Sequence, residues 1–267
     1  MPPPAIRVGT CGFSYPEWIN AGIYPKGTKS ADMLTLYSLR FPVVELNYTW
    51  YQMPMADSVE RMSRRVGPGF QFSVKLTRTM THEVDSDWRN HTMRFRQGIA
   101  PLIETGQLVT VLIQLPPTFE RTTDKRLHLA HLLDALEGLP LAVEFRHRSW
   151  ATDRVFSGLE QRRVTLVAVD TPPLTHLFPS MTVCTNPDLF YVRLHGRNEA
   201  GWRSGAMQQK FNYDYSEKEL REWAGDKIPV MADSCTQGLL FFNNHVAGQA
   251  FRNGENMVGL LKQAAGD

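Results

Sequence analysis

The segment most informative about the architecture is Leu141-Ala142-Val143-Glu144-Phe145-Arg146-His147-Arg148-Ser149-Trp150, an apolar run that ends in a cluster of charges. Successive side chains of an extended strand point to opposite faces, so Glu144 and Arg146 share one face and Val143 and Phe145 share the other. Two explanations fit an acid and a base on one buried strand face. One is a structural ion pair, and the other is a site at the carboxyl edge of a parallel sheet, where α/β proteins place their chemistry.

Apolar runs typical of buried strands alternate with stretches of helical periodicity along the whole chain. The predicted strands are residues 6–11, 43–47, 70–76, 108–115, the segment that starts at 141, 165–170, 189–195 and 239–243. The predicted helices are residues 31–39, 57–66, one within 89–104, 125–136, 154–163, 216–223 and 247–265. The helix from Ser216 opens with a capping box, Ser216 to Glu219.

Alternation repeated about eight times in roughly 250 residues is the pattern expected of a TIM-type (β/α)8 barrel. We therefore predict one barrel domain over residues 1–267, with an irregular connection after the sixth strand. A doubly wound open sheet is the alternative, but Gly9 and Gly12 do not complete its GxGxxG turn. The short apolar piece Ile228–Ala232 is either an extra strand or an insertion before the last strand.

Composition excludes several classes of protein. The net charge of +2 gives no global argument for a nucleic-acid or membrane partner. The three cysteines, Cys11, Cys184 and Cys235, lie far apart without CxxC spacing, so neither a disulfide framework nor a zinc knuckle is indicated. The first residues lack the basic and apolar regions of a signal peptide, and no apolar run approaches the roughly 20 residues that span a bilayer. We expect a cytoplasmic protein.

Polar residues recur on one face of the predicted strands, near their carboxyl ends. In the seventh strand, for example, Arg193 and His195 lie opposite Val192 and Leu194. In a barrel this polar face points toward the axis, and active sites lie at the carboxyl-terminal mouth. One strand of this kind is explained by structure alone, whereas six or seven indicate a site. The residues predicted to act there as acids or bases are Glu45, Lys75, Glu144, Asp170 and His195.

The other residues predicted at this mouth are basic, amide or aromatic and suit substrate binding. They are His82, Gln114, Arg146, His147, Arg193, Arg197, Asn243, Asn244, Tyr48 and Trp150. Crowded basic side chains favour phosphate or carboxylate. For Glu144, a structural pair with Arg146 or Arg193 stays open, and a lysine such as Lys75 is more often a salt-bridge donor than a Schiff-base nucleophile. A stacking rim for a sugar or a base is expected from Phe13, Tyr15, Trp18, Tyr48, Trp50, Tyr51, Trp150 and Trp202.

Several motifs resemble one known family over nearly the whole chain. They include Arg7-Val8-Gly9-Thr10-Cys11-Gly12-Phe13-Ser14-Tyr15-Pro16-Glu17-Trp18, Val44-Glu45-Leu46-Asn47-Tyr48-Thr49-Trp50-Tyr51-Gln52-Met53-Pro54, Tyr191-Val192-Arg193-Leu194-His195-Gly196 and Phe242-Asn243-Asn244-His245. This pattern resembles the YecE-like family, number seventy-two among the domains of unknown function. The resemblance implies a TIM barrel and no particular reaction. Departures from the pattern are Cys11 in place of a serine, His245 in place of an acidic residue, and the extra segment 228–238.

Two classes of function follow from these residues, and a third stays open. The first is an enzyme that uses acid–base chemistry on a small phosphorylated or carboxylated molecule. The second is a nucleic-acid-binding protein or a phosphodiesterase of the endonuclease-IV-like type, and the third is a noncatalytic ligand-binding barrel. No cofactor is predicted. A divalent metal is the less favoured alternative, because each acidic or His candidate is interleaved with Arg or Lys and no HExxH is present.

Overall fold

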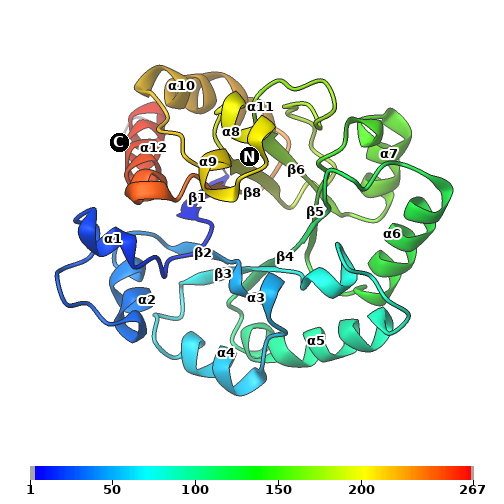
Figure 1. Cartoon of the computed structure of the whole chain (residues 1–267), viewed down its shortest axis with the longest axis horizontal. Coiled ribbons are helices and arrows are strands. Elements are labelled where there is room, and N and C mark those ends of the chain that lie inside the picture. The colour runs from blue at the N-terminus through cyan, green and yellow to red at the C-terminus, as the bar shows by residue number, and fades with distance from the viewer. Residues whose placement is uncertain (1–3, 266–267) are drawn as a thin grey trace.

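The strands of the computed structural model form a barrel, which confirms the predicted fold class (Figure 1). The structure describes residues 4–265. Its parallel strands follow one another around an eight-stranded sheet in the order β1-β8-β7-β6-β5-β4-β3-β2. The strands are β1 Ala5–Thr10, β2 Val43–Leu46, β3 Gln71–Lys75, β4 Leu108–Gln114, β5 Leu141–Glu144, β6 Thr165–Asp170, β7 Phe190–Leu194 and β8 Gln237–Phe242.

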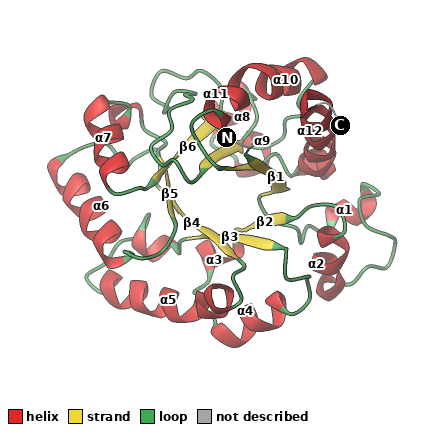
Figure 2. Cartoon of the chain, turned by 180° about the vertical axis from the view of Figure 1, so that it is seen from behind, coloured by secondary structure: helices red, strands yellow, loops and turns green. Residues whose placement is uncertain are grey.

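Helices surround this ring of strands, as the view from behind also shows (Figure 2). They are α1 Glu17–Asn20, α2 Ser30–Ser38, α3 Tyr48–Tyr51, α4 Ala56–Ser63, α5 Trp88–Glu104, α6 Thr123–Ala135, α7 Asp153–Gln161, α8 Glu199–Ser204, α9 Met207–Lys210, α10 Glu217–Glu222, α11 Ile228–Ala232 and α12 Gln249–Ala265. Among residues 4–265, no helix is both long and apolar enough to cross a lipid bilayer.

The predicted strands agree with the observed ones to within two residues at each end. The connection after β6 is irregular as expected, because residues 171–189 contain neither a helix nor a strand of the sheet. The piece Ile228–Ala232 is not an extra strand but the helix α11, which continues from α10 through the wider turns of Trp223–Lys227. The insertion before β8 is therefore helical.

Side chains on the outer face of the strands form the main apolar core beneath the helices. Phe242 of β8, for example, lies with Phe41 against Gly254 of α12, where an added Cβ would lie 3.0 Å from the ring of Phe41. Phe41 in turn packs edge-on against Phe251 of α12. The inner face instead holds buried polar groups from opposite strands, which contact one another across the axis. The fold thus separates an apolar outer core from a charged interior that leads to the mouth.

The seam between β1 and β2 closes the barrel with little backbone pairing. The two strands share one isolated parallel bridge, Cys11 with Glu45, next to a hydrogen bond from the Gly12 amide to the Glu45 carbonyl at 2.9 Å. Gly9 lets the strands approach here, because a Cβ at this position would lie 2.2 Å from the carbonyl oxygen of Val43. The seam therefore places Glu45 beside Cys11 in the barrel interior.

Candidate active site at the barrel mouth

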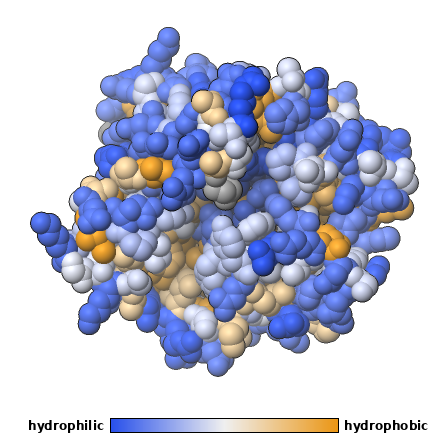
Figure 3. All heavy atoms as spheres, in the orientation of Figure 1, coloured by the Kyte–Doolittle hydropathy of each residue, from blue (hydrophilic) through white to orange (hydrophobic). Residues whose placement is uncertain are grey.

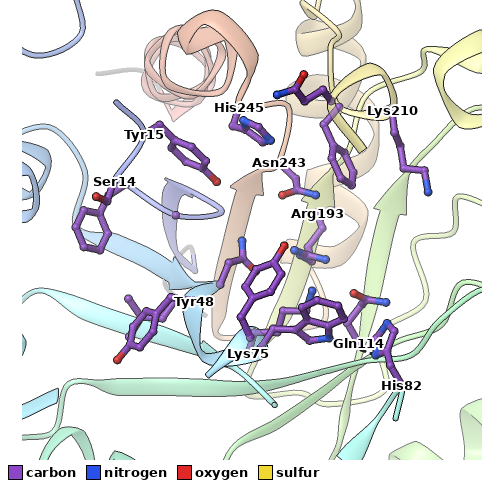
Figure 4. Close-up of a pocket in the computed structure, with 18 of the residues that line it drawn as sticks. Ser14, Tyr15, Tyr48, Lys75, His82, Gln114, Arg193, Lys210, Asn243 and His245 are labelled. Carbon is purple, nitrogen blue, oxygen red and sulfur yellow. Dashed lines mark hydrogen bonds between the residues drawn. The ribbon is translucent and has the colours of Figure 1, made fainter. Parts of the chain in front are cut away.

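A cavity of about 890 Å³, which we call the mouth pocket, opens at the carboxyl ends of the strands (Figure 4). Its polar lining comes from almost every side of the barrel: Ser14, Asn47, Lys75, His82, Gln114, Arg146, Arg193, Gln208, Lys210, Asn243 and His245. The rest of its lining is Gly12, Phe13, Tyr15, Leu46, Tyr48, Trp50, Tyr51, Pro116, Pro117 and Phe211. The face of the molecule seen in Figure 1 is mostly hydrophilic (Figure 3).

Arg193 is the centre of the charged network below this pocket. It extends from β7 across the axis, and its exposed fraction is 1%. Its Nη1 donates to Glu144 at 2.6 Å, and its Nη2 donates to Glu45 at 2.6 Å and to the Cys11 sulfur at 3.4 Å. The Tyr191 hydroxyl donates to the second oxygen of Glu45 at 2.5 Å. Glu45 and Glu144 thus bind the guanidinium of Arg193 below the pocket, and Arg193 itself lines the pocket.

Glu144 of β5 holds a second guanidinium in the same way. The Arg146 Nε donates to its Oε1, and the side chain of Glu144 is fully buried. Burial alone would raise the pKa of Glu144, but the charges of Arg146 and Arg193 outweigh it and hold the pKa well below its usual range. Glu144 is therefore a fixed anion that positions two arginines.

His195 connects this network to Asn243. Its Nε2 lies 3.1 Å from Arg146 Nη2 and 3.4 Å from Glu144 Oε2, and its Nδ1 lies 3.0 Å from the amide nitrogen of Asn243. Burial and the charge of Arg146 hold the pKa of His195 well below its usual range, so the ring is neutral. His195 therefore links the Glu144–Arg146 pair to a residue of the pocket lining.

Lys75, Arg146 and Arg193 line the pocket together, and we call these three residues the pocket floor. Lys75 is the one of the three that has no carboxylate partner among residues 4–265. Within the described part of the chain, no hydrogen bond or ion pair involves its Nζ, which lies 5.2 Å from the centre of the Trp50 ring. Burial, and after it the charge of Arg193, lower the pKa of Lys75 to about 7. At neutral pH the amine is therefore shared between its charged and neutral forms.

His82 lines the pocket as a neutral imidazole. The Trp50 indole nitrogen lies 3.3 Å from its Nδ1, and an indole can only donate, so Nδ1 accepts and Nε2 carries the proton. Burial and the charges of Lys75 and Arg146 lower the pKa of His82 to about 4. The ring is thus a hydrogen-bond donor rather than a cation at neutral pH.

The structure brings together most of the residues predicted for the site, in two layers. Seven of them line the pocket: Tyr48, Lys75, His82, Gln114, Arg146, Arg193 and Asn243. Glu45, Glu144 and His195 lie beneath as their buried partners. The predicted aromatic rim is formed in part, because Phe13, Tyr15, Tyr48, Trp50 and Tyr51 line the pocket whereas Trp18, Trp150 and Trp202 do not.

Asp170 is placed on the other side of the sheet. The register pairs Val169 with Arg193 and Asp170 with Leu194, so Asp170 shares the outward face of Leu194. There it accepts hydrogen bonds from Arg197 Nε at 2.8 Å and from the Trp223 indole at 2.6 Å. Asp170 and Arg197 therefore join β6 and β7 to the helical layer rather than line the pocket.

Three further predicted residues also lie outside the pocket lining, each in a local structural contact. The His147 Nδ1 is 2.8 Å from the Ser149 hydroxyl. Trp150 stacks on Phe145 at 4.7 Å and donates to the carbonyl of Phe119. Asn244 donates to the carbonyl of Tyr213 at 2.8 Å. These side chains hold the loops around the mouth in place.

Five polar residues of the pocket lining were not among the predicted site residues: Ser14, Asn47, Gln208, Lys210 and His245. Gln208, Lys210 and Phe211 come from α9 and the turn after it, which lie far along the chain from any motif. His245 was recognised only as a departure from the family pattern, and its ring stacks on Tyr15 at 4.6 Å. The run Phe242-Asn243-Asn244-His245, which continues beyond β8, was the available signal.

Metal ligands do not gather in the described part of the chain. Among residues 4–265, no group of three or more His, Cys, Asp or Glu side chains is arranged to hold a metal ion. The carboxylates nearest the pocket, Glu45 and Glu144, are engaged with arginines.

Comparison with known proteins identifies relatives along the whole chain. A family model described as "Protein of unknown function DUF72" matches residues 7–267. The crystal structure of a DUF72 family protein from Thermotoga maritima is 32% identical, with a TM-score of 0.87 over 97% of this chain and 99% of that one. A DUF72 family structure from Enterococcus faecalis is 26% identical, with a TM-score of 0.85 over 96% and 95% of the two chains. The UPF0759 protein YunF of Bacillus subtilis is 28% identical over 90% of both chains.

Proposed function

We propose that this chain, which belongs to the DUF72 family, is an enzyme that uses acid–base chemistry on a small anionic substrate in the mouth pocket. One observation carries the proposal. Lys75 lies on the pocket floor with Arg146 and Arg193, and it alone of the three lacks a carboxylate partner in the described residues. An unpaired amine beside two oriented guanidinium groups suits both the binding of an anion and the transfer of a proton.

The charges of the site support an anionic ligand. Arg146 and Arg193 are balanced by Glu45 and Glu144, so a protonated Lys75 leaves the floor with one positive charge in excess. The Arg193 Nε is buried and has no hydrogen-bond partner among residues 4–265. A buried donor of this kind calls for an acceptor, and a carboxylate or phosphate oxygen supplies one.

The same residues support a division of roles. A pKa of about 7 is close to the optimum for a general base at neutral pH, so Lys75 is assigned to proton transfer. His82, with its proton on Nε2, and the amides of Gln114 and Asn243 are assigned to hydrogen bonds with the polar atoms of the substrate. Glu45, Glu144 and His195 act one layer below by positioning the arginines and Asn243.

The compactness of the basic cluster favours a small molecule over the nucleic-acid alternative. Nucleic-acid sites distribute Lys and Arg over a wide footprint that neutralises many phosphates. Here the cations converge on one pocket, whose walls include the aromatic rings of Tyr15, Tyr48 and Trp50. The aromatic walls also suit a substrate that carries a ring.

Sulfate binding as a function of pH tests the proposal. Sulfate keeps its charge between pH 6 and 9, so a change in affinity reports on the protein. Because the anion favours protonated Lys75, affinity measured by calorimetry should fall as pH rises through about 7, approaching tenfold per pH unit at higher pH.

Lys75→Gln should weaken sulfate binding at pH 6 and remove the pH dependence. Lys227→Gln is the matched control, since Lys227 is partly buried but paired with Glu222 at 2.8 Å and does not line the pocket. Arg193→Ala is less informative, because it leaves the buried carboxylates of Glu45 and Glu144 without the guanidinium they share and would lower stability. Sulfate affinity that is independent of pH and of Lys75 would contradict the proposal, as would tight oligonucleotide binding without a response to sulfate.

A further inference from the structure

We propose that Lys75 is a covalent nucleophile that forms an imine with the carbonyl carbon of a 2-oxo acid held in the mouth pocket. The inference rests on the proposed function, since it requires that the pocket bind an anion. It goes further by naming the substrate class and the bond that is made.

The surroundings of the Lys75 amine carry the proposal. Its main chain is fixed, because the Thr49 hydroxyl donates to the Lys75 carbonyl at 2.6 Å, while its Nζ is free of any carboxylate in the described residues. Lys227, by contrast, is paired with Glu222 at 2.8 Å. A lysine that must stay charged for structure is normally paired when buried, whereas a nucleophilic lysine is activated by an apolar pocket or by a neighbouring cation. Lys75 has both activating features, because Leu46 and several aromatic rings share its pocket and the cation of Arg193 lies in the same pocket floor.

The neighbouring groups select the substrate class. A 2-oxo acid carries a carboxylate directly next to its carbonyl carbon, so a carboxylate held by Arg146 and Arg193 brings the carbonyl toward Lys75 in the same pocket. The protonated Nε2 of His82 provides a neutral donor for the carbonyl oxygen. The lowered pKa of Lys75, about 7, supports this role because it supplies neutral amine at neutral pH.

The proposed step is balanced without any external oxidant or reductant. The lone pair of the neutral Nζ attacks the carbonyl carbon, and the proton that the nitrogen loses passes to the oxygen. The resulting carbinolamine takes up one proton from solvent and loses water, which leaves a protonated C=N bond to Lys75. This cation withdraws electrons from the adjacent carbon, so that a C–H or C–C bond there is more easily broken.

Reductive trapping tests the proposal. The intact protein is incubated with pyruvate, with oxaloacetate or with 2-oxoglutarate, reduced with sodium borohydride and analysed by mass spectrometry. A mass gain of one oxo acid, minus one water and plus two hydrogens, is expected with at least one probe. Trypsin should then fail to cleave after Lys75, so that residues 66–78 appear as one modified peptide. Lactate, which has no carbonyl, is expected to give no adduct.

Lys75→Gln should abolish the adduct, and Lys227→Gln should leave it unchanged. Excess sulfate should compete with trapping in the wild-type protein. An adduct spread over surface lysines, or no adduct at Lys75 with any of the three oxo acids, would overturn the imine proposal. If sulfate binding still depends on Lys75 and on pH in that case, the proposed anion-binding, acid–base function stands without the covalent step.

Discussion

Glu144→Gln separates a positioning role of this carboxylate from a chemical one. The substitution keeps the shape of the side chain and one oxygen, but it removes the charge that faces Arg146 and Arg193. The new amide group also turns a donor toward a guanidinium that can only donate. Because the side chain is fully buried, water cannot replace the lost partner. We therefore expect a large loss of stability.

The expected magnitude follows from the burial of the pair. Removing one partner of a buried ion pair costs about 3–5 kcal/mol, because the remaining charge is left uncompensated. The entropy of unfolding is about 2.1 cal/mol/K per residue, which for 267 residues is about 0.56 kcal/mol/K. The melting temperature should thus fall by about 5–9 °C. Glu60→Gln, which removes an exposed ion pair with Arg64, is the control and should cost less than about 1 kcal/mol.

The assay is urea unfolding followed by circular dichroism, at several pH values. A carboxylate whose pKa is depressed in the folded state stabilises the protein above the pKa of the unfolded chain, about 4.3, and loses this contribution as pH falls through the folded value. The difference between wild type and Glu144→Gln should therefore be full at pH 7 and shrink below pH 4. A loss of less than about 1 kcal/mol at pH 7 would refute the positioning role and return Glu144 to the list of candidate acids and bases.

Two other substitutions test the arrangement of the site. Asp170→Asn should lower stability, because Asp170 accepts from Arg197 and Trp223 on the outer face, but should leave sulfate affinity unchanged; a loss of affinity at unchanged stability would place Asp170 in the site after all. Lys75→Met should stabilise the protein at pH 7, and its advantage should shrink as pH rises toward 10, because the unfolded chain binds the extra proton between about 7 and 10.4. Denaturant titrations at pH 7 and pH 10 check this, and a constant difference would contradict the lowered pKa.

The barrel could be predicted from the sequence because its signals are local. Each strand is a short apolar run, and the alternation with helical periodicity suffices to define the architecture. The helix α11 could not be predicted as a helix, since five mostly apolar residues are as typical of a strand as of a helix until their neighbours in space are known. The polar face was equally local: parity along β2, β5 and β7 places Glu45, Glu144 and Arg193 on the inner surface.

What escaped prediction depends on the pairing of segments distant in sequence. Asp170 is the last residue of its strand, as Glu144 is of β5. The register of β6 against β7 nevertheless places the Asp170 side chain on the outer face of the sheet, and this register cannot be predicted from either strand alone. Lys210 and Phe211 reach the pocket only because the long connection after β7 folds back over the mouth. Whether Glu144 positions other groups or reacts was also undecidable, since the answer depends on two arginines meeting it in space.

The seam between β1 and β2 affects local opening of the barrel. Local opening is easiest where two strands share the fewest backbone hydrogen bonds, and here the pairing is reduced to the bridge between Cys11 and Glu45. Arg193 extends from β7 across the barrel and contacts the same two residues, so it links β7 to the part of the ring with the fewest backbone hydrogen bonds. We expect the amide of Gly12, which donates across the seam, to report on ligand binding. Gly12 also lines the mouth pocket, so an anion that binds there and holds Arg193 in place should slow the hydrogen exchange of this amide.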